Sequence, residues 1–132
     1  MKSEPDVYGI DHLQQEQTTL WDGIRNYQAR NFMREMEVGD RGFFYHSQTE
    51  KAVVGTVEVI ARAHPDSTTD DPRWECVDIR ALETAPRPVT LEEIKADPRL
   101  SEMVLVRNSR LSVQPVTPEE WRIVCDLAGL VP

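Results

Sequence analysis

The chain has 132 residues, of which 39% are hydrophobic and 29% charged, a composition typical of a globular protein and not of a disordered or membrane-embedded one. Its formal net charge of −8 argues against a non-specific nucleic-acid binder, because such proteins usually carry a basic surface. No apolar run is long enough to cross a bilayer, and no signal-peptide core is present. We therefore expect one domain over residues 1–132, with Cys76 and Cys125 as free thiols in the reducing cytoplasm.

The first half of the chain predicts two helices and a strand. Residues 10–16 form a short helix for which Asp11 is a plausible N-cap. Asn26 is expected to cap a second helix, whose apolar residues recur at i, i+3, i+4 and i+7 on one face: Ala29, Phe32, Met33 and Met36. A turn over residues 38–40 then leads to an aromatic-rich strand over residues 41–47.

The next part of the chain predicts two strands and a helix. Apolar residues alternate with more polar ones over residues 53–63, which indicates a strand. A loop rich in proline and aspartate separates it from a further strand over residues 74–82. Thr90 and Glu93 have the spacing of a capping box and predict a helix that ends near Pro98.

The last part predicts one or two strands over residues 104–116 and a final helix. Thr117, Pro118 and Glu120 have the spacing of an N-cap, a first-turn proline and a third-position acid. The core face of that helix is expected to carry Trp121, Val124, Cys125 and Ala128. Because strands and short helices interleave without the regular alternation of a parallel sheet, we predict an α+β fold with a small mixed β-barrel.

Residues 21–32 are the most unusual stretch, Trp-Asp-Gly-Ile-Arg-Asn-Tyr-Gln-Ala-Arg-Asn-Phe, and they lie where an amphipathic helix should begin. Their aromatic rings, amides and guanidinium groups indicate a recognition surface, since such groups stabilise little when exposed unless something binds them. Trp21 could stack a base, which contributes about 1–3 kcal/mol, or could fill the core. The first interpretation requires that Trp21 border a cavity that solvent can reach.

The polar residues of this stretch are further candidates. Asn26 and Tyr27 could present an amide and a phenol to a base edge, and Asn26 could equally serve only as a helix cap. Arg25, Arg30 and Arg34 are candidate phosphate contacts, with ordinary solvated helix charges as the alternative. These arginines give residues 21–34 a local charge of +2. Because salt screens exposed charges over about 8 Å, distant acidic residues do not exclude a specific site here.

The aromatic strand ends in polar residues. Phe44 is expected to face the opposite side of the strand from Phe43 and Tyr45, so that some of these rings lie in the core. Tyr45, His46 and Ser47 are binding candidates, because they can donate and accept hydrogen bonds. The other two tryptophans lack such polar neighbours and are expected in the core: Trp74 and Trp121.

Four segments, in this order, resemble the EVE domain, a branch of the PUA-like superfamily that also includes the YTH and ASCH domains: Lys-Ser-Glu-Pro at 2–5, then 21–31, 43–47 and 109–116. The resemblance spans essentially the whole chain and implies a compact β-barrel with flanking helices and a pocket on one side. By similarity to YTH domains, which hold a methylated adenine in an aromatic cage, it implies a non-catalytic reader of a modified base in DNA or RNA. Family members usually carry a few apolar residues just before Lys-Ser-Glu-Pro. Only Met1 stands before this motif in the present sequence, so a short first strand is expected.

The resemblance also adds ligand-binding candidates outside the central stretch: Lys2, Ser3, Glu4, Arg110, Leu111 and Ser112. Among them Ser3 is favoured as a direct contact, and Arg110 is a natural clamp for a phosphate or a base edge. The three histidines and two cysteines lack the spacing of metal ligands, so neither a metal nor another cofactor is expected. We expect a monomer with no membrane partner.

Two other functions remain open. The chain could be a small enzyme, similar to ASCH-type amidohydrolases, that acts on a free modified nucleoside and depends on Lys2, Glu4 or His46. It could also be a protein-interaction domain that uses its acidic surface, which would leave the Trp21 stretch unexplained. The sequence favours the binding module, because stacking and hydrogen-bonding residues abound while an activated nucleophile is missing.

Overall fold

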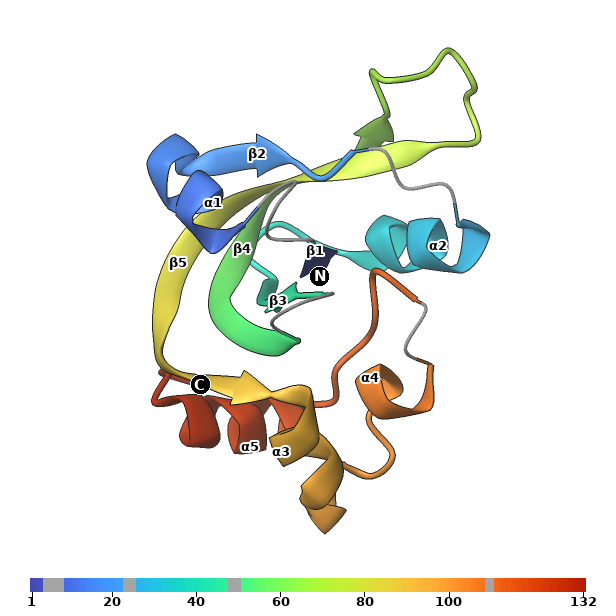
Figure 1. The fold of residues 1–132 in the computed structure, drawn as a ribbon. Helices are drawn as coiled ribbons and strands as arrows, with labels where there is room; N and C mark the ends of the chain where they lie inside the picture. Colours follow the sequence, from blue (N-terminus) through green and yellow to red (C-terminus); the bar gives the residue numbers. More distant parts are fainter. Residues whose placement is uncertain (4–8, 23–25, 48–50, 109–110) are drawn as a thin grey trace.

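The computed structural model describes residues 1–3, 9–22, 26–47, 51–108 and 111–132 (Figure 1). Strands from the N-terminal end and the middle of the chain form one sheet, and short helices lie on either side of it. The described elements, in chain order, are β1 (Lys2–Ser3), α1 (Ile10–Glu16), β2 (Thr18–Leu20), α2 (Tyr27–Glu35), β3 (Arg41–His46), β4 (Ala52–Pro65), β5 (Glu75–Thr90), α3 (Leu91–Ala96), the 3-10 turn η1 (Pro98–Leu100), α4 (Val104–Arg107) and α5 (Pro118–Ala128).

The sheet has the strand order β1-β3-β4-β5-β2, in which β1 runs parallel to β3 and the other neighbours are antiparallel. It is strongly curved but, among the described strands, it does not close into a barrel (Figure 1). Repeated register shifts between β4 and β5 bend the two long strands. At one of these bends a Cβ on Gly55 would lie 2.5 Å from the Glu83 carbonyl oxygen, so only glycine fits there.

Alternation along β3 divides the interior into two cores. Phe44 is fully buried in a core that also holds Leu13 of α1 and Met33 of α2. Phe43 and Tyr45, on the other face, pack in a second core with side chains from α3 and α5, among them Ile94, Val124 and Cys125. The predicted orientation of these three rings is therefore confirmed.

Local signals at the helix starts are mostly confirmed. Asn26 accepts a hydrogen bond from the Ala29 N–H at 2.9 Å, and capping boxes begin α3 at Thr90 and α5 at Thr117. The N-cap of α1 is Gly9 and not Asp11, which lies in the first turn. Gly9 takes the extended backbone conformation of a cap, and its N–H donates to Nδ1 of His12 at 2.8 Å. The imidazole thus satisfies a donor at this helix start.

The expected strands over residues 104–116 are wrong. Residues 104–107 form α4, and the described residues that follow, 111–117, contain no strand. The apolar run is only a few residues long, and such a run does not distinguish a strand from a helical turn. It follows η1 directly, and the Val106 and Arg107 N–H groups both donate to the Met103 carbonyl. This part of the chain therefore continues in a helical path.

Sequence patterns also missed the short edge strand β2, whose three residues pair with Asp78, Ile79 and Arg80 of β5. The expected strand over residues 74–82 is the first part of the longer β5. The first strand is short, as expected from this chain's departure from the family pattern: β1 has two residues. Among the helices of the described residues, none has the length and apolar character needed to span a membrane.

Candidate functional site

Trp21 begins a row of three aromatic rings that crosses the first core. Its backbone N–H donates to the Val77 carbonyl at 2.8 Å, which holds the residue against β5 just after β2. Its ring meets Phe44 edge to face, with centroids 5.7 Å apart, and Phe44 meets His46 in the same way at 5.8 Å. We call Trp21, Phe44 and His46 the ring row; it links two of the predicted binding residues through a buried phenylalanine.

The ring of Trp21 is buried, with 8% of the residue exposed. It packs in the first core with Ala29 and Met33 from the inner face of α2. Within the described residues the ring therefore does not present an open face to solvent. The expected role of Trp21 as a base-stacking residue stays a prediction.

The indole N–H of Trp21 has no hydrogen-bond acceptor within the described part of the chain, although the nitrogen is buried. A buried donor without a partner costs about 1–3 kcal/mol relative to one that is satisfied. Tryptophan N–H groups usually find a partner when buried. Nε1 of Trp21 is consequently a donor available to an acceptor that the described chain does not supply.

At the other end of the ring row, His46 is 5% exposed and its Nε2 accepts a hydrogen bond from the Ile10 N–H at 2.9 Å. The neighbouring Ser47 N–H donates to the Ser3 carbonyl at 2.8 Å, as part of the parallel pairing of β1 with β3. The structure therefore brings together three of the predicted binding residues: Ser3, His46 and Ser47. Leu111, 3% exposed, packs in the same core as Trp21.

Three other predicted residues lie on or beside the edge strand β1. The Lys2 N–H donates to the Ser112 carbonyl at 3.0 Å, and Nζ of Lys2 lies 5.7 Å from the centroid of the Tyr45 ring. Burial lowers the pKa of Lys2 and raises the pKa of Tyr45. These three residues line a largely apolar hollow of about 440 Å³.

Trp121 lines the same hollow and, unlike Val124, Cys125 and Ala128 of α5, is only partly buried. Its ring stacks on Phe43 at 4.2 Å and lies 5.2 Å from the Arg41 guanidinium carbon. Trp21 is not among the residues that line this hollow. The predicted binding residues are thus divided between the ring row and this hollow, whose lining includes residues of both cores.

Helix α2 carries four further predicted residues, and each has a partner in the structure. Asn26 caps the helix, and Arg34 pairs with Glu75 of β5. Tyr27, 49% exposed, lies between the Trp74 ring, at 4.9 Å, and the Arg30 guanidinium carbon, at 4.8 Å from its centroid. Arg30 Nη1 donates to the Arg73 carbonyl at 3.0 Å.

Tyr27, Arg30, Arg73 and Trp74 form what we call the cation–aromatic cluster. Sequence patterns gave no role to Arg73 and placed Trp74 in the core, whereas Trp74 is only partly buried. The available signal was the Arg-Trp pair directly after the Asp-Asp-Pro turn. Three predicted residues lie outside the described part of the chain: Glu4, Arg25 and Arg110.

The described residues contain no group of three or more histidine, cysteine, aspartate or glutamate side chains placed to hold a metal ion. Both cysteines are free and buried. What the described geometry offers is hydrogen bonding and aromatic contact: an unpaired indole donor in one core and a cationic, aromatic face on α2.

The fold and these segments define a member of a known family. The model of the EVE domain matches residues 1–127, and the chain belongs to the EVE domain family. Among curated proteins it is 37% identical to human thymocyte nuclear protein 1 over 161 residues, an alignment that covers 96% of this chain and 72% of the human protein. The expected family and the α+β PUA-like fold are both confirmed.

Solved structures agree with this assignment. A crystal structure of a protein from Agrobacterium tumefaciens is 53% identical and has a TM-score of 0.94, covering 98% of this chain and 90% of that one. A crystal structure of the human THYN1 protein in complex with DNA containing 5-methylcytosine is 36% identical, with a TM-score of 0.89 and coverage of 100% and 97%. An ASCH protein from Zymomonas mobilis, 13% identical with a TM-score of 0.59, shares the fold alone.

Proposed function

We propose that this chain is a non-catalytic module that binds DNA and recognises a modified base, with 5-methylcytosine as the first candidate. The observation that carries the proposal is the similarity to the human protein in complex with 5-methylcytosine DNA, which extends over the whole chain at 36% identity. The overall acidity of the chain is consistent with a specific site, because it disfavours loose binding to any nucleic acid.

The indole N–H of Trp21 supports the proposal on chemical grounds. It is a buried donor without an acceptor in the described residues, and base edges carry acceptors such as the carbonyl oxygen and ring nitrogen of cytosine. A base drawn out of the duplex would satisfy this donor while it contacts the aromatic rings nearby. In this proposal Trp21 acts through its N–H, and its ring edge closes one side of the site.

The remaining site residues are proposed from the same side of the sheet. Ser3, Asn26, His46, Ser47 and Leu111 surround the ends of the ring row or begin α2. Three residues outside the described part of the chain complete the proposed set: Glu4, Arg25 and Arg110. Lys2, Tyr45 and Ser112 line the hollow, which Trp21 does not border, so they are the weakest members.

An enzyme acting on a free modified nucleoside has no specific support. The likeness to the ASCH protein is a likeness of fold. Nε2 of His46, one of the residues on which such an enzyme would depend, already accepts a hydrogen bond from the Ile10 N–H. The preference for DNA over RNA follows the human complex, and a cytoplasmic location and a monomeric state stay predictions.

A matched oligonucleotide panel tests the proposal. Four labelled probes would carry one central sequence: a duplex with one 5-methylcytosine, the same duplex unmodified, and the two corresponding RNAs. Fluorescence anisotropy should show the methylated duplex bound at least about tenfold more tightly, because one methyl group in a fitted pocket contributes about 1–3 kcal/mol. Equal affinity for both duplexes would reject the proposal. Conversion of a modified nucleoside to a product, detected by mass spectrometry, would favour the enzyme.

A further inference from the structure

We propose that the polar edge of the cation–aromatic cluster, formed by Tyr27, Arg30 and Arg73, contacts the sugar-phosphate backbone of the DNA strand next to the base-recognition site. This inference rests on the proposed function and adds a second contact surface to it. The surface joins two parts of the chain, the first turn of α2 and the end of the β4–β5 connection, which lie on the same side of the molecule in Figure 1.

Helix α2 connects the two sites physically. Its inner face packs Ala29 and Met33 against Trp21 in the first core. Its outer face carries Tyr27 and Arg30, three residues apart and therefore side by side. A strand whose base reaches Trp21 would pass along this helix, because the indole packs in one core with the helix's inner face.

The ring of Tyr27 already contacts two neighbours. Trp74 lies tilted by 34° against the ring at 4.9 Å, and the Arg30 guanidinium lies over it at 4.8 Å. Tyr27 is nevertheless 49% exposed, and the hydrogen bond at its hydroxyl lies at the surface. What the surface offers a partner is therefore polar.

The groups that remain accessible are hydrogen-bond donors. The Tyr27 hydroxyl accepts a bond from Nη1 of Arg73 at 2.9 Å, which leaves its own proton to donate. Arg30 uses three of its five N–H groups, two toward Oδ1 of Asn31 and one toward the Arg73 carbonyl. A set of donors with a positive charge fits a partner that only accepts and is negative, which is the phosphodiester group.

Arg30 supplies the uncompensated charge. Among the described residues no carboxylate lies within 4 Å of its guanidinium, whereas Arg34 pairs with Glu75 and Arg73 with Asp71. Asp70 is an exposed acid in the connection between β4 and β5, and its negative charge would repel a phosphate bound nearby. The contact is consequently expected to add affinity without carrying the binding alone.

Arg30→Gln removes this charge, and Tyr27→Phe removes only the hydroxyl. We expect Arg30→Gln to weaken binding of the methylated and the unmethylated duplex by the same factor, about threefold to tenfold. It should also lower the salt slope, the dependence of the logarithm of the binding constant on the logarithm of the salt concentration, by about 1 in magnitude. Tyr27→Phe should weaken both duplexes by about twofold to threefold. Arg30→Lys should keep the salt slope, since it keeps the charge. Circular dichroism melting would confirm that each variant is folded.

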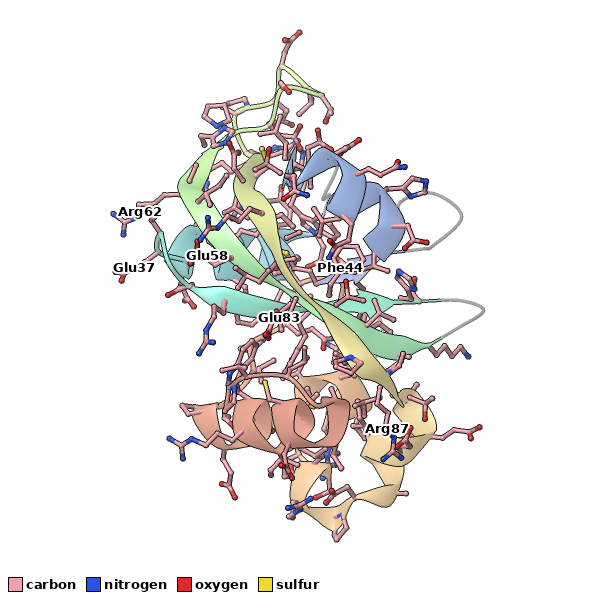
Figure 2. All side chains as sticks on the ribbon, turned by 90° about the vertical axis from the view of Figure 1, so that its left-hand side faces the viewer. Glu37, Phe44, Glu58, Arg62, Glu83 and Arg87 are labelled. Atoms are coloured by element: carbon pink, nitrogen blue, oxygen red, sulfur yellow. The ribbon has the colours of Figure 1, made fainter. Side chains whose placement is uncertain are left out.

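The matched control is Arg87→Gln, which makes the same charge change at the far end of β5, beside α3 (Figure 2). Arg87 is exposed and pairs with Glu93, and its replacement should leave affinity and slope unchanged. Wild-type affinity and slope in Arg30→Gln would overturn the inference, as would a change in selectivity with an unchanged slope. Equal binding of the two duplexes by the wild-type protein would reject the proposed function but not this inference, because the salt slope of Arg30→Gln would still test the backbone contact. Absence of any DNA binding would overturn both.

Discussion

Trp21 and Phe44 meet edge to face, with ring centroids 5.7 Å apart and planes at 80°. One residue follows the edge strand β2 and the other lies in the centre of β3, so the contact fixes the proposed recognition residue to the sheet. Phe44 is fully buried and is labelled in Figure 2. The position of the indole, and of its unpaired N–H, therefore depends on a phenylalanine that has no polar group of its own.

Phe44→Leu should lower the free energy of unfolding by about 1–3 kcal/mol, because it removes two ring contacts and leaves a small cavity. Urea denaturation measures this change. Phe32→Leu, at a partly buried position packed against the same core, should cost less. Equal losses in the two variants would contradict a special role for the Phe44 ring.

Asn26→Ala should lower the free energy of unfolding by about 1 kcal/mol, since the Ala29 N–H loses its cap. Asn26→Asp should retain that stability. Thr117→Ala removes the comparable cap of α5, away from the proposed site, and should cost a similar amount. If Asn26 also contacts DNA, Asn26→Ala weakens DNA binding and Thr117→Ala does not. If Asn26→Ala and Thr117→Ala both bind DNA like the wild type, the role of Asn26 is restricted to capping.

The helix starts illustrate what sequence alone could predict. Each of three cap side chains accepts a hydrogen bond from the backbone N–H three residues later: Asn26, Thr90 and Thr117. Residue type and spacing therefore suffice to identify these caps. The faces of β3 follow from strict alternation in the same way. The family resemblance placed these elements in the correct fold.

What sequence could not predict depends on contacts between distant segments. Trp74 lies against Tyr27 because β5 returns to α2, and no local pattern encodes that meeting. The apolar run at α4 is too short to show its period, so tertiary context decided its conformation. The separation of Lys2 and Tyr45 from the ring row likewise follows from the pairing of β1 with β3.

His64 gives the fold a pH dependence. A hydrogen bond to the Asp78 carboxylate, at 2.6 Å, raises the pKa of His64 in the folded protein. A raised pKa stabilises the fold fully below the unfolded value of about 6.5, and the contribution is lost as pH rises through the folded value. The advantage of the wild type over His64→Gln in free energy of unfolding should therefore shrink between about pH 5.5 and about pH 8.5.

The effect should be small, because the His64 side chain is 38% exposed and solvent screens the pair. Asp78→Asn should flatten the same pH profile. An advantage that grows toward alkaline pH would contradict the assigned interaction.

Both cysteines should be unreactive in the folded protein. Burial, followed by the nearby Asp66, Asp22 and Asp78, raises the pKa of Cys76 to about 11, and burial also raises the pKa of Cys125. At about pH 8 the reactive thiolate is therefore scarce as well as inaccessible. A chromogenic disulfide reagent should titrate two thiols in urea and none in buffer. Rapid reaction of either cysteine in buffer would contradict its burial.

The most direct test of the central claim is the selectivity of Trp21→Phe, the ratio of its dissociation constants for unmethylated and methylated duplexes. This variant keeps an aromatic ring and removes the indole N–H. Trp121→Phe is the matched control, because its Nε1 is also buried without an acceptor in the described chain but lies on α5. The account predicts that Trp21→Phe loses about threefold to tenfold in affinity for the methylated duplex, with a reduced ratio, while Trp121→Phe retains the wild-type ratio. A folded Trp21→Phe with wild-type affinity and selectivity would contradict it.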